Sequence, residues 1–171
     1  MVKDDRKKNR LLANAVANLK RDKLGMGIDL LDEILLIDPN SKVALLARGS
    51  VYLKMGNANN AKSDFSRILD IDANHPKAYH LRGLSRQMEG DNDGALNDFN
   101  RAIDIDPKYD AAYYSRSILL TNKGQDTEAA EVLKMVAQPT NVDVQNFANE
   151  NNLWRSQGLR FENILKDEVD N

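Results

Sequence analysis

Apolar and small side chains recur along the chain at a fixed interval of 34 residues. The stretches 64–83 and 98–117 share the patterns Asp-Phe-x-Arg, Asp-x-Asp and Ala-Tyr, and a shift of 34 superimposes them. The 34-residue spacing continues before residue 64 and after residue 117, where four columns of apolar or small residues follow it. They hold Leu11, Leu45, Tyr79 and Tyr113; Ala15, Gly49, Gly83 and Ser117; Gly27, Ala61, Ala95 and Ala129; and Leu31, Phe65, Phe99 and Leu133. Self-similarity at this period is the sequence signature of a repeat protein.

Within each period the pattern predicts two helices. In the second period, apolar or small residues follow the i, i+4, i+7 spacing of a helix face twice, with a break at residues 55–60 between the two runs. They are Leu45, Gly49 and Tyr52 in the first run, and Ala61, Phe65 and Ile68 in the second. Each period is therefore expected to fold as a helix, a turn and a second helix.

Glycine and proline separate the expected helices. The glycines between the two helices of a period stand 34 residues apart and are Gly56, Gly90 and Gly124. A glycine there can take the left-handed conformation that ends a helix. Asp22 occupies this place in the first period, so the sequence defines that turn less well. Pro39 and Pro107 are expected to end the second helices of the first and third periods, because proline disfavours helix in the residue before it.

This spacing resembles the tetratricopeptide repeat, whose pattern of Trp-x2-Leu-Gly-x2-Tyr, then Ala-x3-Phe, then proline, spans 34 residues. The resemblance covers residues 8–139. Leu or Tyr replaces the family's Trp, and Arg48, Arg82 and Arg116 replace its Leu. The resemblance implies an all-α fold, an α-solenoid in which antiparallel helix pairs stack into a right-handed superhelix. A single pair cannot bury its apolar face alone, so the pairs must stack.

The period also predicts the organisation of the chain as one solenoid domain. Residues 1–7 form an N-terminal flank, and the four repeats are residues 8–41, 42–75, 76–109 and 110–143. Residues 144–171 form a degenerate fifth unit with capping helices and an acidic tail. Asn163 and Asp167 stand there where a small and a large apolar residue belong, which is typical of a terminal cap.

Composition narrows the classes of partner. The chain has 24 Lys+Arg and 26 Asp+Glu, so its formal net charge of -2 offers no overall attraction to a nucleic acid or an anionic membrane. The basic residues near the N-terminus are diluted by Asp4 and Asp5, and we expect a solvated chain end. No apolar run is long enough to span a membrane, and Asn14 and Asn18 interrupt any export signal, so a cytoplasmic location is expected.

The sequence offers little for catalysis, and we expect no enzyme, cofactor or metal. There is no cysteine, and the two histidines, His75 and His80, have no second ligand at helical spacing. Residues 70–74 supply three alternate oxygens as in a calcium loop, but His75 stands where glycine is needed and Leu81 where the closing glutamate belongs. No glycine-rich phosphate loop or nucleophile motif is present.

An arginine recurs at the same position of three first helices. Arg48 and Arg82 have Asp64 and Asp98 in register on the second helix of the same repeat, so ion pairs between the two helices are expected. Arg116 has Val132 in the partner column instead. It either pairs with a neighbouring repeat or contacts an acidic group of a ligand.

The best candidate for a binding site is a second line of residues on the first helices, which we call the first-helix stripe. It lies one residue beyond the packing column and follows i, i+4, i+7 spacing. Its members are Leu12, Val16, Leu19, Leu46, Ser50, Leu53, His80, Leu84, Gln87, Tyr114, Ile118 and Thr121. The resemblance implies that this face lines the concave groove, where a peptide segment of a partner protein binds. The competing interpretation is that neighbouring first helices cover the stripe.

The expected function is thus a non-catalytic adaptor or assembly factor in protein–protein interaction. The alternatives are a self-associating homo-oligomeric scaffold and, less favoured, an accessory subunit of an enzyme. Family members that hold acidic chaperone tails use Lys, Asn and Arg on the inner wall, and the matching columns here lack that clamp. The chain's own tail, through Phe161, Ile164 and Leu165, is a further candidate occupant of the groove.

Overall fold

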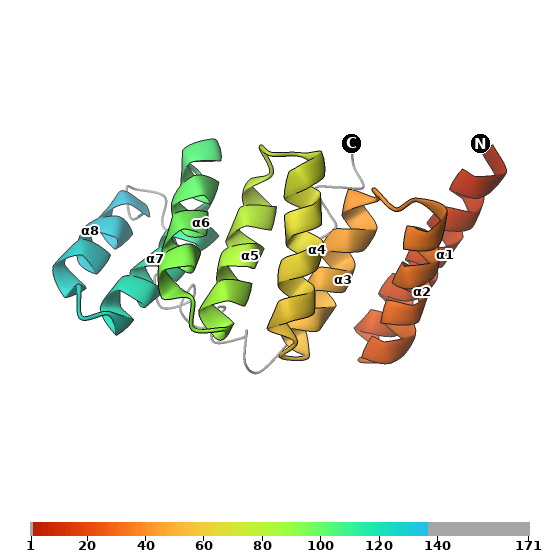
Figure 1. Ribbon diagram of the computed structural model, residues 1–171, viewed down its shortest axis with the longest axis horizontal. Coiled ribbons are helices and arrows are strands. Elements are labelled where there is room, and N and C mark those ends of the chain that lie inside the picture. Colours follow the sequence, from red (N-terminus) through yellow and green to blue (C-terminus); the bar gives the residue numbers. More distant parts are fainter. Residues whose placement is uncertain (1, 137–171) are drawn as a thin grey trace. The chain divides into compact units, whose positions relative to one another are not determined.

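The computed structural model describes residues 2–136, and within this range it contains eight α-helices and no strand. The helices are α1 (Val2–Lys20), α2 (Leu24–Ile37), α3 (Lys42–Lys54), α4 (Ala58–Ile71), α5 (Pro76–Met88), α6 (Asn92–Ile105), α7 (Asp110–Asn122) and α8 (Asp126–Val136). They form four sequential pairs of similar length, as the period predicts (Figure 1).

The described chain divides into two compact units. Unit 1, residues 2–73, contains α1 to α4, and unit 2, residues 74–136, contains α5 to α8. In each unit the two helices of a pair pack on each other, and the second helix of one pair packs on the first helix of the next. The expected repeat boundaries themselves remain predictions, and α1 begins already at Val2.

Four left-handed residues make the turns inside the pairs. Gly56, Gly90 and Gly124 have φ of 77°, 84° and 76°, as the sequence predicts. Asp22 has φ of 59° and so takes the same conformation without being glycine. All four pairs therefore use one turn geometry, although an aspartate in this conformation bears a steric cost that glycine avoids.

The second helices end at an aspartate with extended backbone. α2, α4 and α6 end at Ile37, Ile71 and Ile105, and each following aspartate donates its N–H to the carbonyl four residues earlier. Proline follows two of these aspartates but not Asp72, so proline is not required for the stop. The side chains at the starts of α3, α4, α5 and α6 cap the free N–H groups, with His75 Nδ1 accepting from the Ala78 N–H at 3.1 Å.

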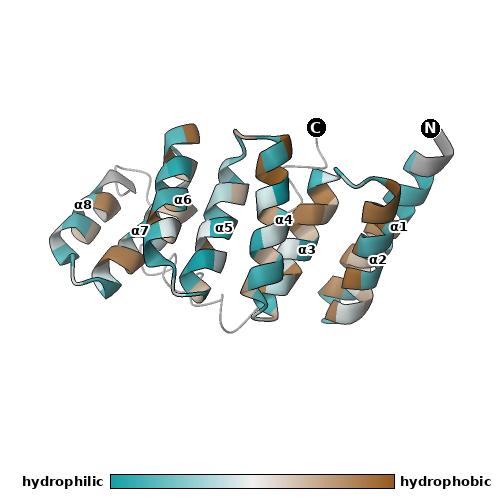
Figure 2. Ribbon diagram, viewed as in Figure 1, coloured by the Kyte–Doolittle hydropathy of each residue, from teal (hydrophilic) through white to brown (hydrophobic). Residues whose placement is uncertain are grey.

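The core of each pair is built on the small and large columns of the sequence pattern. Phe65 and Phe99 are fully buried and lie against Gly49 and Gly83. Ala61 and Ala95 are also fully buried, so the two helices of these pairs approach closely. Hydrophobic and hydrophilic residues both occur along the helices (Figure 2). Exposed large apolar side chains lie on several helices, and the two most exposed, Leu36 at 83% and Met26 at 56%, are on α2.

Candidate functional site

In unit 1 most of the first-helix stripe is buried. Leu46 and Ser50 on α3 have no exposed surface, and Leu53 and Leu19 are almost as deep. The Ser50 hydroxyl donates to the Leu46 carbonyl at 2.8 Å, so this polar side chain is satisfied within its own helix. The two remaining members of the stripe in this unit, Leu12 and Val16 on α1, are half-buried.

In unit 2 the stripe changes from buried to exposed along the chain. His80 and Leu84 on α5 are buried, whereas Gln87 is half-buried. On α7, Tyr114 is half-buried, Ile118 is 40% exposed, and Thr121 is exposed. The part of the first-helix stripe that a ligand can reach in this unit therefore comprises an aromatic, an aliphatic and two polar side chains.

His80 shows what covers the buried part of the stripe in unit 2. Its ring nitrogens lie 3.1 Å from the Tyr109 hydroxyl and 2.9 Å from the Ser115 hydroxyl, and its ring lies 5.7 Å from that of Phe99. Ser115 is on α7, so the neighbouring first helix covers this position. Burial, with a smaller effect of Lys77, lowers the pKa of His80 to about 3, so the ring is neutral near pH 7.

The two predicted arginine–aspartate pairs are present. Arg48 donates from Nε and Nη2 to Asp64 at 2.9 and 2.6 Å, and Arg82 donates in the same way to Asp98 at 2.9 and 2.7 Å. Both aspartates are buried while both arginines are half-buried. Burial raises the pKa of Asp64, and the Arg48 guanidinium opposes this effect. These arginines are structural, and each also lies over a tyrosine ring of its own helix.

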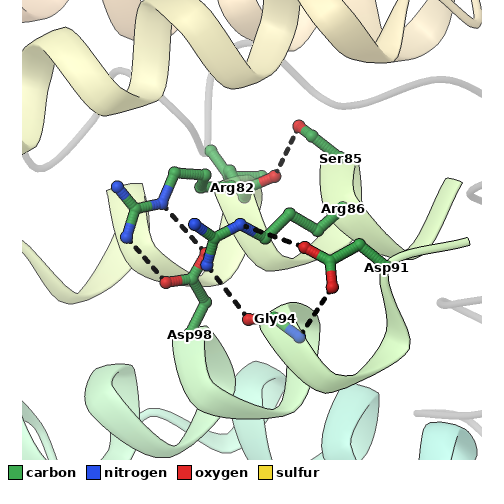
Figure 3. A network of polar contacts seen from close by, with 7 residues as sticks. Arg82, Ser85, Arg86, Asp91, Gly94 and Asp98 are labelled. Carbon is green, nitrogen blue, oxygen red and sulfur yellow. Dashed lines mark hydrogen bonds and ion pairs between the residues drawn. The ribbon is translucent and has the colours of Figure 1, made fainter. Parts of the chain in front are cut away.

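Further members of these networks were not predicted. Arg48 also donates to Asp32 on α2 and thereby connects two helix pairs of unit 1. In unit 2, Arg86 lies 2.9 Å from Asp98, 3.7 Å from Asp91 and donates to the Gly94 carbonyl at 3.1 Å (Figure 3). Asp32 lies on the helix pair before that of Arg48, and Arg86 lies one turn beyond Arg82. The sequence pattern compares the arginine column only with the aspartate column of the same repeat, so it finds neither contact.

Arg116 pairs within its own helix pair. Its Nη2 lies 3.4 Å from Glu128 Oε1 on α8, one turn before the Val132 of the partner column. Glu128 is half-exposed, unlike Asp64 and Asp98, so this pair is the weakest of the three. A contact of Arg116 with an acidic ligand would have to compete with Glu128.

Two other findings concern the described residues alone. No group of three metal-ligating side chains lies together among residues 2–136. No helix in that range combines the length and the apolar character needed to cross a membrane. The expected fifth unit at residues 144–171 and the tail side chains Phe161, Ile164 and Leu165 lie outside the described residues.

Comparisons with known proteins agree with the repeat pattern. Two sequence profiles described as tetratricopeptide repeat match the chain, one over residues 43–75 and the other over residues 87–148. Together these ranges cover more than half of the chain. A comparison with curated proteins found no match.

Solved structures share the fold at low sequence identity. MamA from Desulfovibrio magneticus RS-1 is 20% identical with a TM-score of 0.71, and the similarity covers 77% of this chain and 74% of that chain. The first tetratricopeptide domain of Spaghetti (RPAP3), bound to the HSP90 peptide SRMEEVD, is 22% identical with a TM-score of 0.66 and coverage of 70% and 94%. The second such domain of human RPAP3, in complex with the HSP70 peptide SGPTIEEVD, is 20% identical with a TM-score of 0.64 and coverage of 68% and 97%. These similarities show an all-α solenoid of helix pairs.

Proposed function

Because the chain belongs to the tetratricopeptide repeat family, we propose that it is a non-catalytic adaptor or assembly factor that binds a peptide segment of a partner protein in the concave groove. The observation that carries this proposal is the exposed end of the first-helix stripe on α7. There Ile118, at 40% exposure, lies in line with Tyr114 and Thr121. An aliphatic anchor point between an aromatic and a hydroxyl side chain suits a helical or extended peptide that inserts an apolar residue.

The chemistry of the stripe indicates the kind of peptide. The two RPAP3 domains hold peptides rich in carboxylates, SRMEEVD and SGPTIEEVD. The first-helix stripe of this chain contains no lysine or arginine, and its histidine is buried and neutral. We therefore expect a ligand held by apolar side chains, with carboxylates contributing little.

A pair of matched substitutions tests this proposal. Peptides would be selected from a random library on the full chain, and their affinities measured by fluorescence anisotropy for wild type, Ile118→Glu and Leu36→Glu. Both substitutions place the same charge at an exposed aliphatic site, but Leu36 is on α2 and outside the stripe. Ile118→Glu should weaken peptide binding at least about tenfold, because it buries an unpaired carboxylate against an apolar ligand. Leu36→Glu should leave the affinity unchanged.

Equal affinity for wild type and Ile118→Glu would exclude the exposed end of the stripe as the binding site. Leu46 and Leu84 also belong to the first-helix stripe, but glutamate substitutions there are unsuitable for this test. Both side chains are buried, so glutamate there would destabilise the fold itself.

Self-association into a homo-oligomeric scaffold is the second candidate, and the exposed apolar side chains of α2 favour it. Leu36 at 83% and Met26 at 56% exposure would be covered in a contact between copies. Light scattering after size-exclusion chromatography tests this candidate. A mass that grows with concentration and returns to that of the monomer in Leu36→Glu, but not in Ile118→Glu, would support the scaffold.

A further inference from the structure

The outer face of α1 carries positive charge and no negative charge. The cationic face, as we call it, consists of the exposed side chains of Arg6, Lys7, Arg10, Ala13 and Ala17 on α1 and of Arg21 directly after its end. Their spacing of three and four residues places them on one side of the helix, opposite the buried Leu11, Ala15 and Leu19. Two small residues in the middle allow another chain to approach the helix backbone closely.

The carboxylates of Asp5 and Asp22, which lie near this face in the sequence, form ion pairs with other cations. Asp5 Oδ1 lies 3.3 Å from Lys8 Nζ, and the same ammonium group donates to Asp38 at 3.1 Å. Asp22 accepts from Lys54 at 2.6 Å. The partners of these carboxylates, Lys8 and Lys54, are not members of the cationic face, so the charge of the face is not neutralised by these pairs.

The surroundings of the face favour a single chain over a broad anionic surface. The cationic face has no large apolar side chain, because Leu11, Ala15 and Leu19 are buried on the opposite side of α1, so it offers no anchor for insertion into a membrane. α2 itself exposes Asp29 and Glu33 beside α1. A membrane or duplex nucleic acid, being wider than one helix, would be repelled by these carboxylates, but a peptide segment can lie along α1 alone.

We propose that the C-terminal segment of this chain, residues 159–171, docks on the cationic face of α1. The segment carries Glu162, Asp167, Glu168 and Asp170 against only Arg160 and Lys166, so its charge is complementary to that of the face. The 22 residues between Val136 and Leu159 form a connection that can span roughly 70 Å when extended.

Apolar side chains support the same pairing. Phe161, Ile164 and Leu165 follow the i, i+3, i+4 spacing of one helix face. Val16 is half-buried on α1 and lies three residues from Ala13, at the edge of the cationic face. The docked segment would cover Ala13, Val16 and Ala17 while its carboxylates meet Arg6 and Arg10. The contact connects the two ends of the chain, and it weakens at high salt because the charges are exposed.

The absence of native cysteine allows a direct distance measurement on the full chain. Asn9 is exposed beside the cationic face, so nitroxide labels at Asn9→Cys and Asn171→Cys report the separation of the segment from the face. We expect a narrow, short distance distribution by double electron–electron resonance. Raising the salt to about 1 M, where the screening length falls to about 3 Å, should broaden it and move it to longer distances.

Charge reversal tests whether these residues form the contact. Arg6→Glu with Arg10→Glu should abolish the short distance, as should Asp167→Lys with Glu168→Lys, and the four changes combined should restore it. The matched control is Arg67→Glu with Arg101→Glu, which reverses two exposed cations on α4 and α6 and should leave the distance unchanged. Circular dichroism checks that all variants keep their helices.

Two results would overturn the proposal. One is a broad, long distribution in the wild type, or one that neither pair of reversals changes. The other is flotation of the labelled protein with phosphatidylserine vesicles that Arg6→Glu with Arg10→Glu abolishes, while the label distance stays long. In that case the cationic face binds an anionic membrane.

Discussion

The ring of Phe65 occupies the space that any side chain at position 49 would need. A Cβ atom added to Gly49 would lie 2.7 Å from Phe65 Cε1 and 2.9 Å from Cζ. Gly83 and Phe99 repeat this relationship, with 2.6 Å from the added Cβ to Phe99 Cε1. The phenylalanine ring therefore excludes any larger residue at the glycine opposite, unless the ring itself is replaced by a smaller side chain.

Gly49→Ala should destabilise the chain even though alanine favours helix. Overpacking against a buried ring costs about 1 to 3 kcal/mol, which exceeds the gain of about 0.5 to 1 kcal/mol from helix propensity. The first helix pair has Ala15 and Leu31 at these positions, and both are fully buried. Adding Phe65→Leu to Gly49→Ala should therefore recover part of the loss.

Urea denaturation of wild type, both single variants and the double variant gives the coupling free energy. A favourable coupling supports the pairing. Strictly additive effects would show that the contact between ring and backbone does not restrict position 49.

The left-handed Asp22 should respond to substitution in the opposite sense from Gly90. Asp22→Gly relieves an unfavourable backbone conformation, although it also removes the ion pair with Lys54. In a Lys54→Gln background, which lacks that pair, Asp22→Gly should raise stability by about 0.5 to 1 kcal/mol. Gly90→Ala should lower it by about 1 kcal/mol. Thermal unfolding measures both, and a loss of stability in Asp22→Gly on that background would contradict this reasoning.

The network around Asp98 should matter more than the Arg116 pair. Arg82→Met removes one of the two arginines that pair with the buried Asp98 carboxylate and leaves Arg86, and we expect a loss of about 1 to 3 kcal/mol. Arg116→Met leaves the half-exposed Glu128 with solvent and with Gln125 Nε2 at 3.3 Å, and we expect a loss of at most about 1 kcal/mol. Equal losses in urea denaturation would show that burial of the carboxylate does not set the strength of these pairs.

Stability should fall as the pH drops below the ordinary pKa of histidine. His80 has a folded pKa of about 3 against 6.5 when unfolded, so between these values the unfolded chain binds a proton that the folded chain does not. The His80 contribution is complete above pH 6.5, and by pH 5 about 2 kcal/mol of it should be lost. Asp64, whose pKa is raised by burial, acts in the opposite sense in more acidic solution.

His80→Leu places at this position the residue that the second helix pair has in the same column, the buried Leu46. The variant loses the hydrogen bonds to Tyr109 and Ser115, so it should be less stable near pH 7. Its unfolding free energy should nevertheless change little between pH 7 and pH 5. An undiminished pH dependence in this variant would assign the effect to other groups.

The sequence predicts the fold well because the repeat presents the same helix signals four times. The eight helices, the three glycine turns and the pairs of Arg48 and Arg82 follow from residue spacing and are confirmed. The conformation of Asp22 could have been inferred from its column, which otherwise contains only glycine.

The exposure of the first-helix stripe could not be predicted in the same way. Spacing shows that these residues share a side of a helix, but it does not show which neighbour covers them. Leu46 and Ile118 occupy neighbouring columns of the stripe, yet one is fully buried and the other is 40% exposed. Likewise, the sequence predicts that Arg116 pairs with a neighbouring repeat or contacts a ligand, but it pairs with Glu128 of its own repeat because a long side chain reaches across one helical turn.

Nuclear magnetic resonance of the isotope-labelled full chain, titrated with a selected peptide, tests the proposed function most directly. We expect the largest amide shift changes on α7 around Tyr114, Ile118 and Thr121, with Gln87 of α5 also affected. Shift changes confined to α2 around Leu36, with none on α7, would contradict the assignment of the first-helix stripe as the peptide-binding surface.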